Sequence, residues 1–275
     1  MVTFHVLTDI AGARLRVFRD RTERTAAELA YDAQPAGVDG NGLELHQTQL
    51  DHQIHEACHV RLHDEHWQHE EKPEHTKTLI RTVGYRFRKH YWIVQGTSRC
   101  VTRDPFESAQ DRVRIHLVTA ARYRGGRLYL WTPGTAGRFV DASGTTGEGP
   151  YFDVSTSGRE RHLFLFKFVG AEGTYEPDYA NRLWISADGA EVWVHSHATA
   201  VSAERPRLRA LAVRLFDYGA PAAPLLHLWQ EDSDFVTDLA GTREADGWIR
   251  FEPRLYSGRT YRFLFQNPAL DPAWE

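Results

Sequence analysis

The sequence is poor in the residues that would indicate thiol chemistry or a membrane. It contains two cysteines, Cys58 and Cys100, and a single methionine. Two cysteines cannot form the framework of several disulfides that holds small secreted domains together, so a reducing compartment suits the chain. No apolar run approaches the roughly 20 residues that span a bilayer, and no basic segment leads into an apolar one at the N-terminus. We therefore expect a cytoplasmic protein that does not enter a membrane.

The sequence also lacks an excess of either charge. Lysine and arginine number 33 and aspartate and glutamate number 37, which gives a net charge of −4 over 275 residues. Proteins that bind nucleic acid carry a basic surface that neutralises phosphates, and this balance does not indicate one. We expect no nucleic-acid partner.

Motifs of common enzyme sites are missing as well. The chain has no Gly-x-Ser-x-Gly element, no phosphate-binding glycine-rich loop and no dinucleotide fingerprint. A (β/α)8 barrel would need more chain than the β-rich stretches described below leave over. Neighbouring acids such as Glu231 and Asp232 are typical of solvated turns. We expect a protein that needs no cofactor and is not an enzyme.

Aromatic residues and glycines are abundant, by contrast. The chain has 8 Trp, 11 Tyr, 14 Phe and 21 Gly. Short stretches in which apolar and polar residues alternate recur along the chain, separated by turns rich in Gly, Pro, Ser and Asp. This pattern predicts an all-β protein built from immunoglobulin-like β-sandwiches.

An internal repeat divides the chain into three parts. Similar strand sequences recur at residues 2–7, 113–118 and 211–216, then at 15–18, 128–131 and 226–229, and again at 58–63, 162–167 and 261–266. The same spacing separates Trp92 from Pro105 and Trp193 from Pro206. Self-similarity of this kind predicts tandem units. The first unit comprises residues 1–105, the second 106–206 and the third 207–275.

The third unit is the shortest. It stops at Asp271-Pro-Ala-Trp-Glu275, where the first two units continue into a further strand. We therefore expect either that the sequence is cut at this point, or that the sandwich keeps an open edge or is completed by another chain, for example in a homodimer through that edge.

The second unit contains a group of motifs that resembles a known family. They are Tyr123-Arg-Gly-Gly-Arg-Leu-Tyr-Leu-Trp131, Phe164-Leu-Phe-Lys167, Glu176-Pro-Asp178, Leu183-Trp-Ile and Glu191-Val-Trp-Val. In these motifs the unit resembles the pullulanase-associated carbohydrate-binding module, family 41. The resemblance covers residues 112–200 well, 207–275 in part and 1–105 poorly. It departs from the family at Gly126, where members usually carry tryptophan.

The resemblance implies a β-sandwich that binds α-1,4- and α-1,6-linked glucans such as starch, glycogen, pullulan or maltooligosaccharides, without catalysis. Carried over residue by residue, it implies that Tyr129 and Trp131 form the sugar platform. It also implies that Lys167 and Asp178 are the polar partners of that platform.

Strand geometry supports the same residues independently. Tyr129 and Trp131 are two residues apart and share one face of a strand, whereas Leu128 and Leu130 share the other. If the leucines fill the core, both rings face outward and can stack on the C–H face of a sugar. The alternative is that the rings fill the core and the leucines face a second layer.

The corresponding positions differ in the other two units. The third unit carries His227 and Trp229 as the pair, with Gln266 in place of the lysine and Asp271 as the acid, a set that could still hold a glucose. In the first unit Arg16 and Phe18 replace the aromatic pair, and His63 replaces the lysine. These replacements indicate a degenerate module or a spacer.

A histidine-rich segment in the first unit allows a competing hypothesis. His55-Glu-Ala-Cys-His59 matches a zinc-hydrolase pattern in which two histidines one helical turn apart bind the metal and Glu56 acts as general base, with His63 as a third-ligand candidate. The repeat instead predicts a strand from Cys58 to His63, where residues four apart do not converge on one ion. Adventitious metal binding, a solvated edge rich in histidine, and an interaction scaffold without sugar binding are the remaining alternatives.

Overall fold

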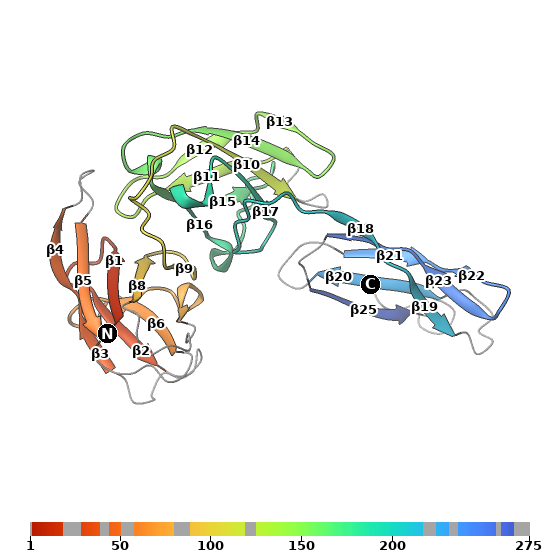
Figure 1. Cartoon of the computed structure of the whole chain (residues 1–275), viewed down its shortest axis with the longest axis horizontal. Helices are drawn as coiled ribbons and strands as arrows, with labels where there is room; N and C mark the ends of the chain where they lie inside the picture. The colour runs from red at the N-terminus through yellow and green to blue at the C-terminus, as the bar shows by residue number, and fades with distance from the viewer. Residues whose placement is uncertain are drawn as a thin grey trace.

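The computed structural model describes residues 2–18, 29–38, 44–50, 58–79, 89–118, 125–216, 224–230, 236–256 and 260–266. Within these ranges the regular elements are β-strands and short 3-10 turns (Figure 1). The prediction of an all-β protein is therefore confirmed. The described strands form seven sheets, and none of these combines strands from two of the predicted units. No helix in the described ranges is long and apolar enough to cross a membrane.

The first unit contains two sheets, with strand orders β4-β5-β1-β8-β9 and β3-β2-β6-β7. The bounds are β1 Val2–Leu7, β2 Arg14–Phe18, β3 Leu29–Asp32, β4 Gln34–Val38, β5 Glu44–Leu50, β6 Cys58–His63, β7 Lys77–Leu79, β8 Lys89–Val94 and β9 Cys100–Val101. A short 3-10 turn, η1, spans Pro73–His75. Strand β1 pairs antiparallel with β5 and parallel with β8, so the two ends of the unit meet in the middle of one sheet.

The second unit repeats this arrangement, with sheets ordered β13-β14-β10-β17 and β12-β11-β15-β16. The bounds are β10 Arg112–Val118, β11 Arg127–Trp131, β12 Arg138–Asp141, β13 Gly144–Thr145, β14 Pro150–Ser155, β15 Leu163–Val169, β16 Arg182–Ile185 and β17 Glu191–His195. The 3-10 turns are η2 Gly158–Arg161, η3 Asp178–Ala180 and η4 Ser186–Asp188. Strand β10 pairs in parallel with β17, as β1 does with β8.

The third unit has smaller sheets, ordered β21-β20-β25, β19-β23-β22 and β18-β24. The bounds are β18 Leu208–Ala210, β19 Val213–Phe216, β20 Leu225–Gln230, β21 Val236–Ala240, β22 Thr242–Arg243, β23 Trp248–Phe251, β24 Arg254–Tyr256 and β25 Tyr261–Gln266. Its large apolar side chains include several that are exposed, namely Leu208, Leu211, Phe216, Val236 and Phe263. The predicted boundaries near residues 105 and 206 remain predictions, and both fall between strands of different sheets.

Each pair of facing sheets encloses an apolar core. In the second unit Ile115 from one sheet and Leu128, Leu130 and Phe166 from the other belong to one cluster of fully buried side chains. Strand residues alternate between the two faces of a sheet, so every second residue enters the core. Burying one such side chain stabilises the fold by about 1.5–3 kcal/mol.

A stacked histidine and tryptophan recur at the parallel strand pair of the first two units. His5 lies opposite Trp92 in β8, with ring centroids 4.3 Å apart and planes 15° apart. His116 lies opposite Trp193 in β17, at 4.8 Å and 4°. The same pairing at both sites indicates that the two units share one architecture.

A buried ion pair recurs in the same two units. Glu176 binds Arg182, with 2.9 Å between Oε1 and the guanidinium, and both side chains are fully buried. In the first unit Glu71 binds the buried Lys77. Each glutamate also accepts a backbone N–H from a residue with positive φ, His197 (2.7 Å) or Gly96 (2.8 Å). The carboxylate therefore fixes a left-handed turn that follows the last long strand of each unit.

The first and second units are joined by an apolar cluster and by ion pairs. The cluster combines Leu7, Trp92, Val94 and Val101 of the first unit with Leu163, Leu165, Leu183 and Ile185 of the second. The Arg99 guanidinium donates to both carboxylate oxygens of Asp188, at 2.6 and 2.7 Å, and to the Leu183 carbonyl at 2.6 Å. We call this region the junction.

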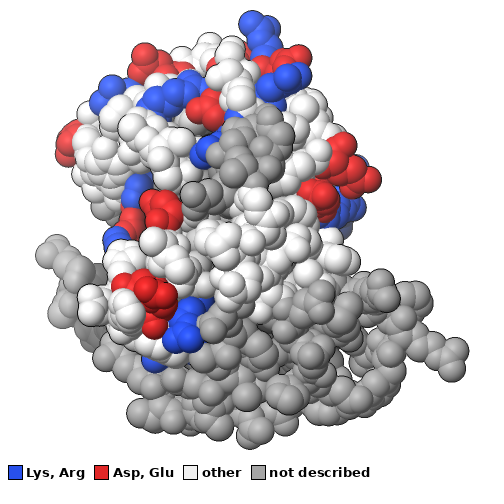
Figure 2. All heavy atoms as spheres, turned by 90° about the vertical axis from the view of Figure 1, so that its left-hand side faces the viewer, with Lys and Arg blue, Asp and Glu red and all other residues white. Residues whose placement is uncertain are grey.

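Figure 2 shows acidic and basic side chains interspersed on the face of the molecule that it draws.

We expect the buried ion pair of the second unit to be essential for its stability. Arg182→Leu leaves the Glu176 carboxylate buried without a counter-charge and should lower the free energy of unfolding by about 3–5 kcal/mol. Urea denaturation followed by tryptophan fluorescence measures this change. The control is Arg205→Leu, because Arg205 pairs with Glu148 at 3.0 Å with a side chain that is 66% exposed, and its loss should cost about 0–1 kcal/mol. Equal losses in the two variants would contradict this expectation.

Candidate functional site

The outer face of the β12-β11-β15-β16 sheet carries the predicted aromatic pair. Leu128 and Leu130 are fully buried in the core of the second unit, whereas Tyr129 and Trp131 are half-buried on the opposite face. Of the two arrangements that the strand pattern left open, the structure shows the one in which the leucines fill the core. The centroids of the Tyr129 and Trp131 rings are 5.4 Å apart and their planes are tilted by 33°. The two rings form a bent surface and are not coplanar.

Two further aromatic side chains extend this surface. Phe139 lies opposite Tyr129 on β12, with ring centroids 5.1 Å apart, and Tyr175 meets the Tyr129 ring edge-on at 6.0 Å. Phe139 is 42% exposed and Tyr175 is 46% exposed. We call the four rings of Tyr129, Trp131, Phe139 and Tyr175 the aromatic face. The position of Tyr129 depends on Gly137, since a Cβ there would lie 2.2 Å from the Tyr129 hydroxyl.

Phe139 and Tyr175 were not predicted from the sequence as members of this surface. Phe139 belongs to the strand that follows β11 across a turn, and Tyr175 comes three residues before Asp178 in a loop. Alternation with period two assigns Phe139 to one of the two faces of its strand. It does not show that this is the face that carries Tyr129. Nothing in the sequence pattern indicates the loop position of Tyr175.

Lys167 and Asp178 lie beside the aromatic face. Lys167 is directly opposite Tyr129 in the sheet, and its Nζ lies 5.9 Å from the centroid of the Trp131 ring and 5.3 Å from that of Tyr175. Ammonium groups at this distance are attracted to aromatic ring faces. Lys167 also donates to Asp178 Oδ1 at 2.7 Å. The structure thus brings the four predicted residues of the second unit together.

The first unit contributes to the same place. Lys72 donates to the other carboxylate oxygen of Asp178, and His75 Nε2 lies 3.2 Å from the Asp178 carbonyl oxygen. Burial by itself would raise the pKa of Asp178, but the hydrogen bonds from Lys167 and Lys72 outweigh it and lower the pKa to about 2. Asp178 is therefore an ionised acceptor held between two ammonium groups.

The edge of the aromatic face nearest the first unit is covered at the junction. Trp131 packs against the apolar cluster of the junction. A Cβ placed on Gly96 would lie 3.9 Å from Trp131 Nε1, and one placed on Gly134 would lie 3.6 Å from the Asp9 Cβ. The first unit therefore forms one border of the aromatic face.

The corresponding surface of the first unit is an ion-pair network. Arg61, and not His63, lies opposite Arg16, so Arg61 occupies the position of Lys167 and the sequence alignment at His63 was wrong by two residues. Glu70 binds Arg61 at 2.9 Å and Arg16 at 3.5 Å, and the Arg16 guanidinium lies 4.0 Å from the Trp67 ring centroid. Charged groups here pair with one another where the second unit presents rings.

The third unit retains part of the aromatic arrangement. His227 and Trp229 share one face of β20, with ring centroids 5.5 Å apart, and His227 Nδ1 lies 2.6 Å from Asp238. Leu264 lies opposite His227, whereas Gln266 lies opposite Leu225. The alignment of Gln266 with Lys167 was therefore also wrong by two residues. The predicted acid of this unit, Asp271, lies outside the described residues.

The histidine-rich segment is described from residue 58 onward. Strand β6 covers Cys58–His63, with Val60 and Leu62 fully buried, so the predicted strand is confirmed. His59 therefore lies in a strand and not in a helical turn. His55 and Glu56 lie outside the described residues. Among the residues that are described, no group of three or more His, Cys, Asp or Glu side chains is placed to hold a metal ion.

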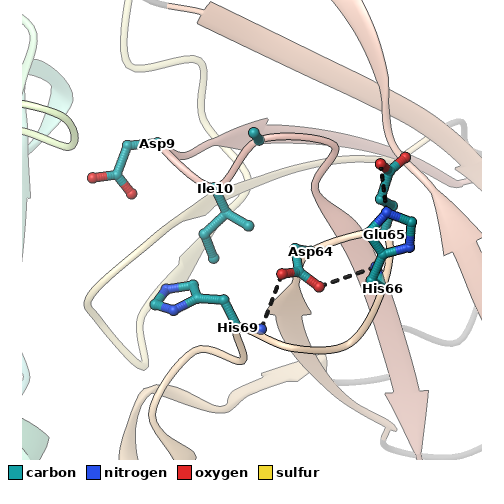
Figure 3. A pocket seen from close by; sticks show the side chains of 7 residues that line it. Asp9, Ile10, Asp64, Glu65, His66 and His69 are labelled. Atoms are coloured by element: carbon teal, nitrogen blue, oxygen red, sulfur yellow. Dashed lines mark hydrogen bonds and ion pairs between the residues drawn. The ribbon is translucent and has the colours of Figure 1, made fainter.

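A shallow hollow lies in the first unit, near the junction. Its volume is about 440 Å³, and its lining comprises Asp9, Ile10, Ala11, Asp64, Glu65, His66 and His69 (Figure 3). The Asp64 carboxylate accepts backbone N–H groups of His66, Gln68 and His69 at 2.8–3.0 Å. These hydrogen bonds hold the loop from residue 64 to residue 69. They account for the position of the Asp64 carboxylate without any ligand.

Comparisons with known proteins give distant similarities. No protein-family model and no curated protein matches the chain. Solved structures that are similar to it include family 41 carbohydrate-binding modules from streptococcal virulence factors, studied for alpha-glucan recognition, with 14% identity and a TM-score of 0.27 over 73% of this chain and 95% of that chain. Another is a streptococcal virulence factor that binds alpha-glucan, with 12% identity and a TM-score of 0.27 over 74% of this chain and 96% of that chain. A further one is the family 26 module CBMbc of Eubacterium rectale Amy13K in complex with maltoheptaose, with 14% identity and a TM-score of 0.26 over 73% of this chain and 94% of that chain. At similarities this low they assign no function to this chain.

The low pKa of Asp178 predicts a pH dependence of stability. The pKa is lower in the folded chain than the ordinary value near 3.9, so the ionised group stabilises the fold above about pH 4, and this contribution is lost as the pH falls toward 2. Asp178→Asn should therefore reduce the loss of stability between about pH 4 and pH 2. Melting temperatures of the two proteins across this window measure the effect. Parallel pH profiles would show that Asp178 is not held by its lysines.

Proposed function

We propose that the chain binds α-glucan at the aromatic face and does not cleave it. The observation that carries this proposal is the exposure of Phe139 and Tyr175 around Tyr129, beside the charged groups of Lys167 and Asp178. Exposed rings offer apolar surface to the C–H faces of sugars, and a few fixed polar groups orient the hydroxyls. A mostly apolar surface with few placed charges is typical of a carbohydrate site.

The shape of the surface favours a curved chain. Tyr129 and Trp131 are tilted by 33° relative to each other, and the Tyr129 and Phe139 rings by 54°. Sugars that stack on such rings must turn from one unit to the next. α-1,4-linked glucans curve in this way, whereas β-1,4-linked glucans are flat and extended. We therefore propose maltooligosaccharides and the α-glucans that contain them as ligands.

The electrostatics of the face favour binding over hydrolysis. A glycosidase needs one carboxylic acid that is protonated near the working pH in order to donate to the leaving group. The pKa of Asp178 is lowered to about 2 by two ammonium groups, so at neutral pH its carboxylate only accepts hydrogen bonds. This acid therefore suits the fixing of a sugar hydroxyl and does not suit general acid catalysis.

The third unit offers a smaller surface of the same kind. His227 and Trp229 are half-buried on the outer face of β20. We propose that this pair holds a second, weaker glucan contact, since Leu264 replaces the ammonium of Lys167.

Titration calorimetry with maltoheptaose and cellohexaose tests the proposal. We expect maltoheptaose to bind with a Kd of roughly 0.01–1 mM and cellohexaose not to bind. Phe139→Ala should weaken binding about fivefold, since a stacked ring contributes on the order of 1 kcal/mol.

The matched control for this experiment is Phe216→Ala. Phe216 and Phe139 are both 42% exposed, but Phe216 lies in the third unit. Its replacement should leave the affinity unchanged. If tens of millimolar maltoheptaose produces neither heat of binding nor a change in tryptophan fluorescence, the proposal is wrong.

A further inference from the structure

Lys72 belongs to the first unit, yet its ammonium group lies in the proposed glucan site of the second. Its Nζ donates to Oδ2 of Asp178, while Lys167 donates to Oδ1 of the same carboxylate. One carboxylate therefore links the two ammonium groups. Lys72 reaches the polar edge of the aromatic face from a segment more than 100 residues away in the sequence.

Lys72 is the more accessible of the two lysines. Its side chain is 61% exposed, against 13% for Lys167 and 28% for Asp178. A lysine ammonium has three N–H donors, and Asp178 takes one from Lys72. Lys167 lies between two rings and the carboxylate, so the donors that a ligand can reach most easily are those of Lys72.

The backbone on both sides of Lys72 is fixed. Glu71, which precedes it, is buried in the pair with Lys77 and accepts the Gly96 backbone N–H. Pro73, which follows it, opens the η1 turn, and this turn places His75 against the Asp178 carbonyl oxygen. A fixed backbone lowers the entropic cost of ordering Lys72 when a ligand binds, so Lys72 is suited to contact a ligand.

We infer that Lys72 is a ligand-contacting residue of the glucan site, which the first unit therefore completes. This inference rests on the proposed function. The Lys72 ammonium donates to hydroxyl oxygens of a glucose unit that extends past the rings toward the junction. Asp178 accepts from the same sugar through the lone pairs that its two lysines leave unused.

Lys72→Met in the full chain tests the inference, because methionine keeps an apolar stem and removes the charge. We expect maltoheptaose to bind five- to tenfold more weakly by calorimetry, and Lys72→Arg to stay within about twofold of the wild type, since both cations donate hydrogen bonds to hydroxyls. Arg205→Met is the surface control, as its side chain is 66% exposed, and should leave the affinity unchanged.

A second control separates a lost contact from a loosened junction. Arg99→Met removes the other ion pair of the junction, with Asp188, and should leave the affinity unchanged. If Arg99→Met weakens binding as much as Lys72→Met does, Lys72 acts through the junction and the inference is overturned. If Lys72→Met binds like the wild type while Phe139→Ala loses affinity, the inference fails and the proposed function stands. Absence of maltoheptaose binding by the wild type removes both.

Discussion

The β12-β11-β15-β16 sheet is apolar on both faces, and the arrangement of the first two units follows from this constraint. Its inner face packs in the core of the second unit, while its outer face presents Leu163, Leu165, Leu183 and Ile185. Removing apolar surface from water is favourable, so a neighbouring unit that packs on this outer face stabilises the fold. The first unit covers the part around β16. The part around β11 and β12 stays accessible, and there the apolar side chains are aromatic.

The corresponding sheets of the first and third units carry different residues on their outer faces, and these residues determine what each face can contact. In the first unit Arg16 and Arg61 both pair with Glu70, so that charged groups occupy the positions where the second unit carries Tyr129 and Lys167. In the third unit Arg262 lies opposite Trp229, where Leu165 lies opposite Trp131 in the second. An arginine there does not offer the apolar surface on which the first unit packs. Inner-face residues thus maintain one architecture while outer-face residues differ.

Strand composition and the core were predictable because alternation with period two is a local property. Leu128 and Leu130, or Val60 and Leu62, reveal their face without knowledge of any partner strand. Cross-strand register was not predictable in the same way. A shift of two residues leaves the face unchanged, so the pattern cannot distinguish Arg61 from His63, and the alignment chose the wrong one. Lys72 depends on the packing of one unit against another, which no local pattern encodes.

The apolar cluster of the junction has a consequence for the synthesis of the chain. Leu7, Trp92, Val94 and Val101 are all present once the first unit has been made. The three leucines and Ile185 that cover them come from β15 and β16. The covering strands end at Ile185, so the first unit emerges from the ribosome well before its apolar surface is shielded. Exposed surface of this kind promotes aggregation of partly made chains. Between the synthesis of Val101 and that of Ile185, the growing chain therefore exposes an apolar surface that the complete fold buries.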